Sequence, residues 1–188
     1  AIEISDGNQR LIVNCGGGNA GGAFVSTALA SGLRTTAAHS SLILADSNST
    51  AIHADGTLGR GVSEIVLERR EAEGGSRIEA SHDGYVRRFG LIHKRTLVLT
   101  SDGRELRGDD VLLPAKAKQK PMTSAFVVRF HLAPGIEATP TADGLGALLR
   151  IEKGALWQFR CRGGTLSIDE SLWVDGNARP QHTLQLVV

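Results

Sequence analysis

The chain has few aromatic residues, little net charge and no long apolar run, so it lacks the features typical of nucleic-acid-binding or membrane proteins. Only 4% of its 188 residues are aromatic, which argues against a broad surface for stacking bases. The formal net charge is +1, so no strong field attracts nucleic acid or anionic lipid, and we expect no nucleic-acid partner. No apolar run approaches the roughly 20 residues that cross a bilayer, which predicts that the chain has no membrane span.

Cysteine and several common catalytic motifs are also scarce or missing. Cys15 and Cys161 are the only cysteines, and their spacing neither requires a disulfide nor supplies a zinc ribbon. The sequence lacks H-E-x-x-H and the G-x-x-x-x-G-K-[ST] phosphate loop. No signal peptide is visible, and the opening AIEISDGNQRLIV already has the pattern of strand, turn and strand. We therefore expect the chain to be part of a longer polypeptide.

Turn signals, in contrast, are abundant. Asp-Gly or a related pair recurs at short intervals, and this pair tolerates the positive φ angles of tight hairpins. Strand-like runs lie between the turns. In ALWQFRCR (155–162), Trp157, Phe159 and Cys161 share one face and mostly polar residues the other, as in a half-buried strand. The pattern predicts an all-β fold, an antiparallel β-sandwich forming a single domain over 1–188, with at most one short helix near 20–33.

The glycine-rich stretch RLIVNCGGGNAGG (10–22) is open to two interpretations. Gly16, Gly18 and Gly21 satisfy G-x-G-x-x-G, the fingerprint of a dinucleotide-binding turn. A Rossmann domain also needs further crossover helices and a parallel sheet, whereas hairpin signals follow here. We therefore favour a tight connection in which glycines let two backbones pass closely, and keep a nucleotide-dependent enzyme as a minor alternative. The lysine-rich PAKAKQKP (114–121) is expected to be an exposed loop.

Three stretches, taken in order, resemble the C-terminal β-rich domain of the heparinase II/III-like family. They are AAHSSLILADSNS (37–49), SHDGY (81–85) and GLIHKRTLVLTSDGRELRGDDVL (90–112). The resemblance covers about 12–188 and implies a supersandwich-like domain at the C-terminal end of a two-domain polysaccharide lyase. In such lyases an N-terminal helical toroid domain of the same polypeptide precedes the sandwich. The resemblance also implies a periplasmic or secreted protein.

The family resemblance implies a reaction as well. Lyases of this kind act on acidic polysaccharides that contain uronate, by β-elimination: a base removes the C5 proton, a neutralising group quenches the carboxylate, and an acid protonates the leaving oxygen. His39 lies at the family's histidine-bearing strand and is the implied catalytic residue. Many relatives carry H-x-H there, whereas this chain has Ala37 two positions before His39. Because no toroid-like region is present, we expect the isolated chain to be inactive. The alternative is a non-catalytic carbohydrate-binding or structural β-sandwich.

A metal site is implied by the same resemblance. The ligands would be His39, Asp55 and His82, with Asp46 and His53 competing for the aspartate's place, and zinc suits such a donor set. DGRELRGDD (102–110) suggests calcium but lacks the EF-hand spacing, so we interpret it as a hairpin turn. Zinc or calcium is therefore the expected cofactor. The competing interpretation is that these histidines are merely exposed or hydrogen-bonded.

The segment around SHDGY supplies candidate sugar contacts. Tyr85 is the only tyrosine and offers a flat ring for stacking on a sugar. Arg88 and Arg95 are predicted to pair with uronate or sulfate groups. The alternative is that the charges of this segment form an ordinary solvated strand surface. His93 and Arg95 share strand parity with leucines, which also permits a buried structural ion pair.

Overall fold

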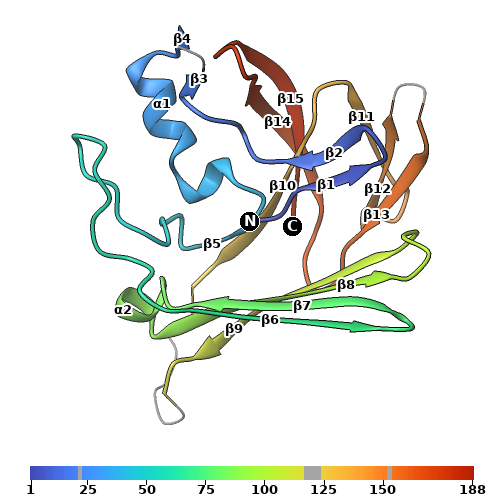
Figure 1. Ribbon diagram of the computed structural model, residues 1–188, viewed down its shortest axis with the longest axis horizontal. Helices are drawn as coiled ribbons and strands as arrows, with labels where there is room; N and C mark the ends of the chain where they lie inside the picture. Colours follow the sequence, from blue (N-terminus) through green and yellow to red (C-terminus); the bar gives the residue numbers. More distant parts are fainter. Residues whose placement is uncertain (21–22, 117–123, 152–153) are drawn as a thin grey trace. The chain divides into compact units, whose positions relative to one another are not determined.

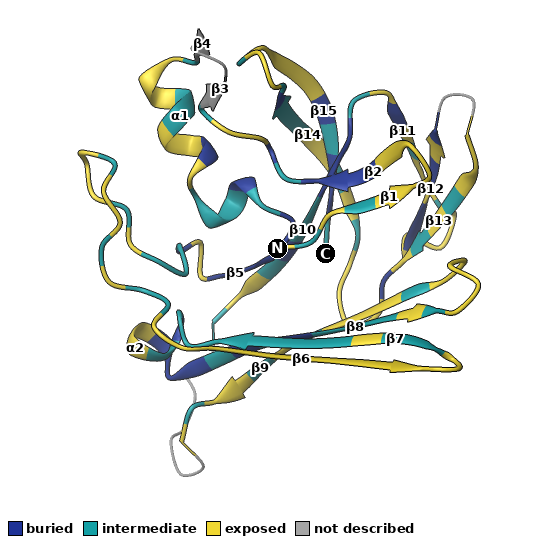
Figure 2. Cartoon of the chain, in the orientation of Figure 1, coloured by how far each residue is buried: buried dark blue, intermediate teal, exposed yellow. Residues whose placement is uncertain are grey.

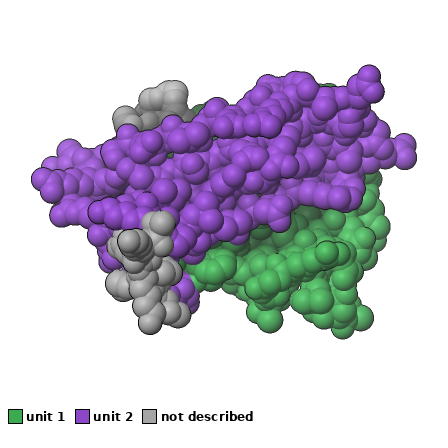
Figure 3. Space-filling model, turned by 90° about the horizontal axis from the view of Figure 1, so that it is seen from below, with its two compact units in different colours: residues 1–48, 126–188 green, residues 49–125 purple. Residues whose placement is uncertain are grey.

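The computed structural model describes residues 1–188 except 21–22, 117–123 and 152–153. The chain divides into two compact units, which Figure 3 distinguishes by colour. Unit 1 contains Ala1–Asn48 and Phe126–Val188, and unit 2 contains Ser49–Ala125. In the part of the chain that the structure describes, no helix has the length and apolar character that a bilayer crossing requires.

Unit 1 is built around a six-stranded antiparallel sheet (Figure 1). Its strand order is β1-β2-β10-β15-β14, and β5 also pairs with β10. The strands are β1 (Ile4–Asp6), β2 (Gln9–Val13), β5 (Leu42–Leu44), β10 (Phe126–Leu132), β14 (Ser167–Val174) and β15 (Pro180–Val187). The sheet therefore joins segments from both ends of the sequence.

A second sheet in unit 1 completes the sandwich. It has three antiparallel strands in sequence order: β11 (Ile136–Pro140), β12 (Gly146–Ile151) and β13 (Leu156–Arg160). One hydrophobic cluster joins residues of both sheets, including Leu11 and Leu132 from the larger sheet and Leu149 from the smaller one. Trp157 and Phe159 of β13 pack against this cluster while Gln158 is exposed, which confirms the alternation expected for ALWQFRCR.

The helical content of unit 1 is small. Helix α1 (Thr27–Leu33) begins after Ser26, whose hydroxyl accepts a hydrogen bond from the Leu29 N–H at 3.3 Å and so caps an otherwise unpaired donor. The 3₁₀ turn η1 (Thr36–Ala38) follows. The two short strands β3 (Asn19–Ala20) and β4 (Ala23–Phe24) precede α1. The helix expected near 20–33 is therefore confirmed, although it begins seven residues later.

Unit 2 is a four-stranded antiparallel meander, β6-β7-β8-β9. The strands are β6 (Ile65–Ala72), β7 (Gly75–His82), β8 (Leu91–Thr100) and β9 (Leu106–Pro114). Edge strand β6 is exposed along its whole length, as its yellow colour in Figure 2 shows. The single turn α2 (Val86–Phe89) connects β7 to β8 and ends at Gly90, whose φ of 72° closes the turn. Nothing in the sequence pattern predicts α2 or η1.

The structure confirms the all-β class, since all the strand pairings described are antiparallel. The glycine-rich stretch is a close backbone passage rather than a dinucleotide turn. A Cβ on Gly16 would lie 2.3 Å from the Val174 carbonyl oxygen, and β2 before it pairs antiparallel with β1 and β10. Gly21 and most of the loop expected at 114–121 lie outside the described residues.

Candidate functional site

The most concentrated polar chemistry of unit 2 lies on one face of its meander. In an antiparallel ladder, directly paired residues point to the same face. His82 of β7 pairs with His93 of β8, and Arg95 of β8 pairs with Asp110 of β9. Because His93 and Arg95 are two residues apart, all four side chains share that face. We call these four residues the sheet network.

The sheet network is a continuous series of hydrogen bonds. The His82 Nε2 and His93 Nδ1 atoms are 3.2 Å apart, and His93 Nε2 lies 2.7 Å from the Asp110 carboxylate. Arg95 donates to both carboxylate oxygens of Asp110, through Nε at 2.8 Å and an Nη atom at 2.9 Å. Such a two-point contact fixes the position of both groups. The buried structural ion pair allowed by the sequence is therefore present, with Asp110 as the acidic partner.

Burial sets the electrostatics of this network. Burial alone would raise the pKa of Asp110, but the hydrogen bonds from His93 and Arg95 and the positive charge of Arg95 outweigh it, so the pKa is lowered. Burial, followed by the nearby His93, lowers the pKa of His82 to about 4. Asp110 is therefore a carboxylate and His82 a neutral ring at physiological pH. The network therefore contains one buried ion pair, between the Asp110 carboxylate and the Arg95 guanidinium.

The turn after β7 presents the predicted sugar contacts. Tyr85 is 1% exposed, with its ring centroid 5.6 Å from that of His82 and 6.3 Å from that of Phe89. Arg95 is 8% exposed and committed to Asp110. Arg88 is exposed and lies over the Phe89 ring. Of the three predicted contacts, only Arg88 thus offers a solvent-facing group, and the sugar-binding role of all three stays a prediction.

The predicted metal ligands occupy different environments. Asp55 is an exposed turn residue whose Oδ1 accepts hydrogen bonds from the Thr57 N–H at 2.9 Å and hydroxyl at 2.7 Å, which lowers its pKa. The competitors Asp46 and His53 are also exposed. His39 belongs to unit 1, whereas Asp55 and His82 belong to unit 2. Within the described residues, no three His, Cys, Asp or Glu side chains form a group that could hold a metal.

His39 itself follows the 3₁₀ turn η1 and is half-buried. Its Nδ1 lies 2.8 Å from the Thr35 carbonyl oxygen. A carbonyl can only accept, so Nδ1 carries a proton, and in the neutral ring Nε2 is the atom with the lone pair. The hydrogen bond to the backbone therefore orients the ring. In the neutral form, Nε2 is the nitrogen that could take part in proton transfer or in metal binding.

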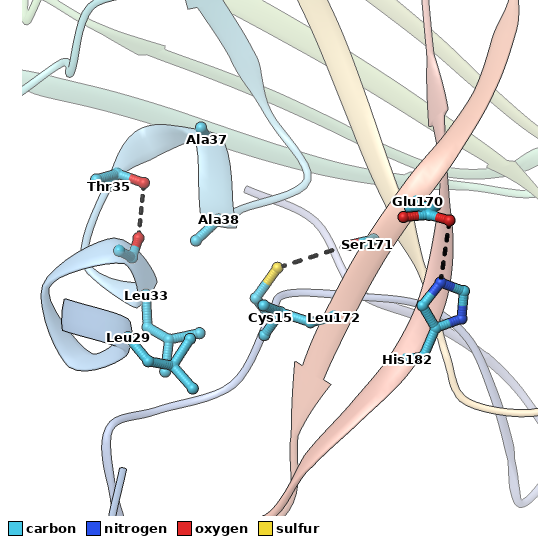
Figure 4. A pocket seen from close by; sticks show the side chains of 11 residues that line it. Cys15, Leu29, Leu33, Thr35, Ala37, Ala38, Glu170, Ser171, Leu172 and His182 are labelled. Atoms are coloured by element: carbon cyan, nitrogen blue, oxygen red, sulfur yellow. Dashed lines mark hydrogen bonds and ion pairs between the residues drawn. The ribbon is translucent and has the colours of Figure 1, made fainter. Parts of the chain in front are cut away.

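A pocket in unit 1 contains chemistry that sequence reasoning missed. It measures about 420 Å³ and is lined mainly by apolar residues of α1, η1 and β14, with Cys15 and Ser171 side by side (Figure 4). Both groups also contact His131, whose Nδ1 lies 2.8 Å from the Ser171 hydroxyl and 3.5 Å from the Cys15 sulfur. His131 Nε2 donates to the Ala37 carbonyl at 2.9 Å, so Nδ1 is the acceptor for both groups.

The pocket cluster is not an activated nucleophile. Burial raises the pKa of Cys15, with the Ser171 hydrogen bond only partly opposing it, and burial also lowers the pKa of His131. A protonated thiol is a poor nucleophile. The signal that could have revealed this cluster is the polar His131 inside the apolar run AFVVRFHL, since a buried polar residue needs partners.

Comparison with known proteins assigns the chain to a family. The family model described as Heparinase II/III-like, C-terminal, matches residues 1–188. The chain belongs to this family. The solved structure of a heparinase III, the BT4657 gene product, matches with a TM-score of 0.74 over 98% of the chain at 13% identity, which shows a shared fold. FtsZ-localized protein C of Caulobacter vibrioides (strain NA1000 / CB15N) is 32% identical over 181 residues, covering 85% of the chain.

This heparinase II/III-like domain is a fraction of each relative. The chain covers 26% of the heparinase III chain and 29% of FtsZ-localized protein C. The family match confirms the resemblance seen in the sequence, and it covers unit 1 and unit 2 together. Within the His-bearing segment, the Ala37 backbone carbonyl accepts from His131, while the Nδ1 of the neighbouring His39 donates to the Thr35 carbonyl.

Proposed function

We propose that this chain is the C-terminal β-sandwich domain of a longer heparinase II/III-like lyase that acts on uronate-containing glycans. In that protein, the domain forms one wall of the glycan cleft, and an N-terminal helical toroid domain of the same polypeptide forms the other. The protein works in the periplasm or outside the cell. The family match over 1–188 is the observation that carries the proposal. The fold shared with a heparinase III supports it.

The surface of α2 supports contact with an acidic glycan. Arg87 and Arg88 are exposed on this turn, next to the SHDGY segment. Among the residues that the structure describes, neither guanidinium has an acidic partner in an ion pair. An unpaired guanidinium can make a two-point contact with a uronate carboxylate or a sulfate. The proposed glycan contact is therefore the α2 turn rather than the buried Tyr85 and Arg95.

His39 is the group that this domain would contribute to β-elimination. Its Nε2 lone pair could accept a proton, while its Nδ1–H is held by Thr35. The remaining base, acid and charge-neutralising groups would come from the toroid domain. We therefore expect the isolated chain to bind the glycan but not to cleave it.

Two measurements test this proposal. In affinity electrophoresis through heparan sulfate or alginate, the chain should be retarded, and the double variant R87A/R88A should lose most of this retardation. The matched control R69A/R70A removes two exposed arginines that are paired with Glu71 and Glu68, and it should behave as the wild type. Equal losses in both variants would contradict a specific α2 contact. Release of unsaturated uronate by the isolated chain would contradict the division of catalytic groups between two domains.

The second candidate function is a non-catalytic carbohydrate-binding or structural sandwich. The presence of Ala37 at the position where many family members are expected to carry a second histidine favours it. The relative at 32% identity is named for localisation with FtsZ rather than for an activity, which also suits this alternative. A His39→Ala change in the longer polypeptide distinguishes the two: loss of uronate cleavage supports the lyase, and glycan binding without cleavage in the unaltered protein supports the alternative.

A further inference from the structure

We propose that His82 is not a metal ligand in this chain and that the sheet network replaces a metal as the brace between β7, β8 and β9. The disagreement is between the donor set implied by the family and the hydrogen bonds that His82 makes. It stands independently of the proposed glycan function. Each nitrogen of the His82 ring can be assigned from its neighbours.

The first nitrogen, Nδ1, accepts a hydrogen bond from the backbone. The Gly84 N–H donates to it at 3.2 Å. A backbone N–H is always a donor, so the Nδ1 lone pair points at Gly84 and is not available to a cation. The close approach depends on Gly84 being glycine, because a Cβ there would lie 2.6 Å from the Ser49 carbonyl oxygen.

The second nitrogen, Nε2, carries the proton and donates it. Because its Nδ1 accepts from Gly84, the His82 ring carries its proton on Nε2, so the neighbouring His93 Nδ1 is the acceptor. His93 therefore holds its own proton on Nε2, which donates to Asp110 at 2.7 Å. His82 Nε2 lies 3.2 Å from that Nδ1 and therefore donates to it. A metal ion needs an sp² nitrogen with a free lone pair, and His82 has none to offer.

Releasing His82 for a metal would break the network. Turning the ring away leaves His93 Nδ1 without its donor, and His93 is only 4% exposed. An unpaired buried acceptor is costly, and it would lie beside the Asp110–Arg95 pair. The remaining members of the implied set are one histidine, His39, and one aspartate, Asp55, and the latter's Oδ1 already accepts two hydrogen bonds from Thr57. Two donors fall short of the usual four around zinc.

The test is nuclear magnetic resonance of the ¹⁵N-histidine-labelled chain, with and without one equivalent of Zn²⁺. We expect His82 and His93 both to show a protonated Nε2 and an unprotonated Nδ1, unchanged by zinc. A zinc-dependent loss of the His82 Nε2 proton, or a metal-shifted His82 nitrogen resonance, would overturn the proposal. Because this measurement uses the unaltered protein, it does not depend on any variant folding.

Thermal unfolding supplies a second measurement with matched variants. We expect Zn²⁺ and EDTA to change the melting temperature of the wild type by less than about 1 °C, since a ligand that does not bind cannot stabilise. H82N should lower it by roughly 5 °C in zinc and in EDTA alike, while H39A and D55A should leave it nearly unchanged. A zinc-dependent rise in melting temperature that disappears in all three variants would show that these residues bind the metal, and would refute the role of the sheet network.

Discussion

Asp110 is the residue whose replacement should lower the stability of unit 2 most. Its side chain is 13% exposed, and it is hydrogen-bonded by Arg95 and by His93. Asp110→Ala would remove the carboxylate that accepts hydrogen bonds from the buried Arg95 guanidinium and from the His93 N–H. Removing one partner of a buried ion pair costs about 3–5 kcal/mol, and the remaining solvent access places this change near the lower end, at about 3 kcal/mol.

The matched control is Asp109→Ala. Asp109 is the adjacent residue on β9, but it is exposed and points to the opposite face of the meander. Its replacement should change the free energy of unfolding by less than about 0.5 kcal/mol. A third variant, Asp110→Asn, keeps an acceptor oxygen but removes the charge, and should fall between the two.

Hydrogen exchange of the β7, β8 and β9 amides is the most direct assay. A loss of about 3 kcal/mol should accelerate the slowest of these amides by about 100-fold, because each 1.4 kcal/mol is a factor of ten. The melting temperature should fall by roughly 6–12 °C for a chain of this size. If D110A and D109A exchange at the same rate, the network does not stabilise the meander and our reasoning about unit 2 is wrong.

Three further predictions concern other parts of the chain. Gly16→Ala should destabilise unit 1 by roughly 2 kcal/mol or more, because Gly16 has a φ of +90° and a Cβ would clash with the Val174 carbonyl, whereas Gly17→Ala should have little effect on the urea midpoint. The contribution of His82 to the free energy of unfolding should fall as the pH is lowered from 6.5 to about 4, because the unfolded chain binds a proton at His82 that the folded chain does not; a wild-type slope over this range that H82N leaves intact would contradict this. Because Cys15 and Cys161 are buried and burial raises the pKa of Cys15, an aromatic disulfide reagent should react with both only after denaturation, and rapid release from the folded chain that C15S abolishes would contradict this for Cys15.

The sequence predicted the fold well at the turns, where the residues of the turn themselves determine the backbone conformation. Asp-Gly pairs place a glycine where the turn requires a positive φ, and Gly103 and Gly144 adopt values of 68° and 67°. Two pairs behave differently. Gly84 leads into the α2 turn without a positive φ, and in the 174–179 turn the positive φ of 59° falls on Ala178. Such exceptions depend on the neighbours that surround the turn, which the local sequence does not show.

The sequence alone determined the succession of strands and turns and the family of the domain. The alternating faces such as that of Trp157 and Phe159, the frequent glycine turns and the motifs of a heparinase II/III-like domain all follow from the pattern of residues. Only the tertiary structure decided which polar side chains have partners. Strand register placed His93 between His82 and Asp110, and brought His131 to Cys15 across 116 residues. The reason is physical: the available lone pairs of a histidine depend on what lies within about 3 Å of its ring, and contacts between distant segments form only when the sheets close.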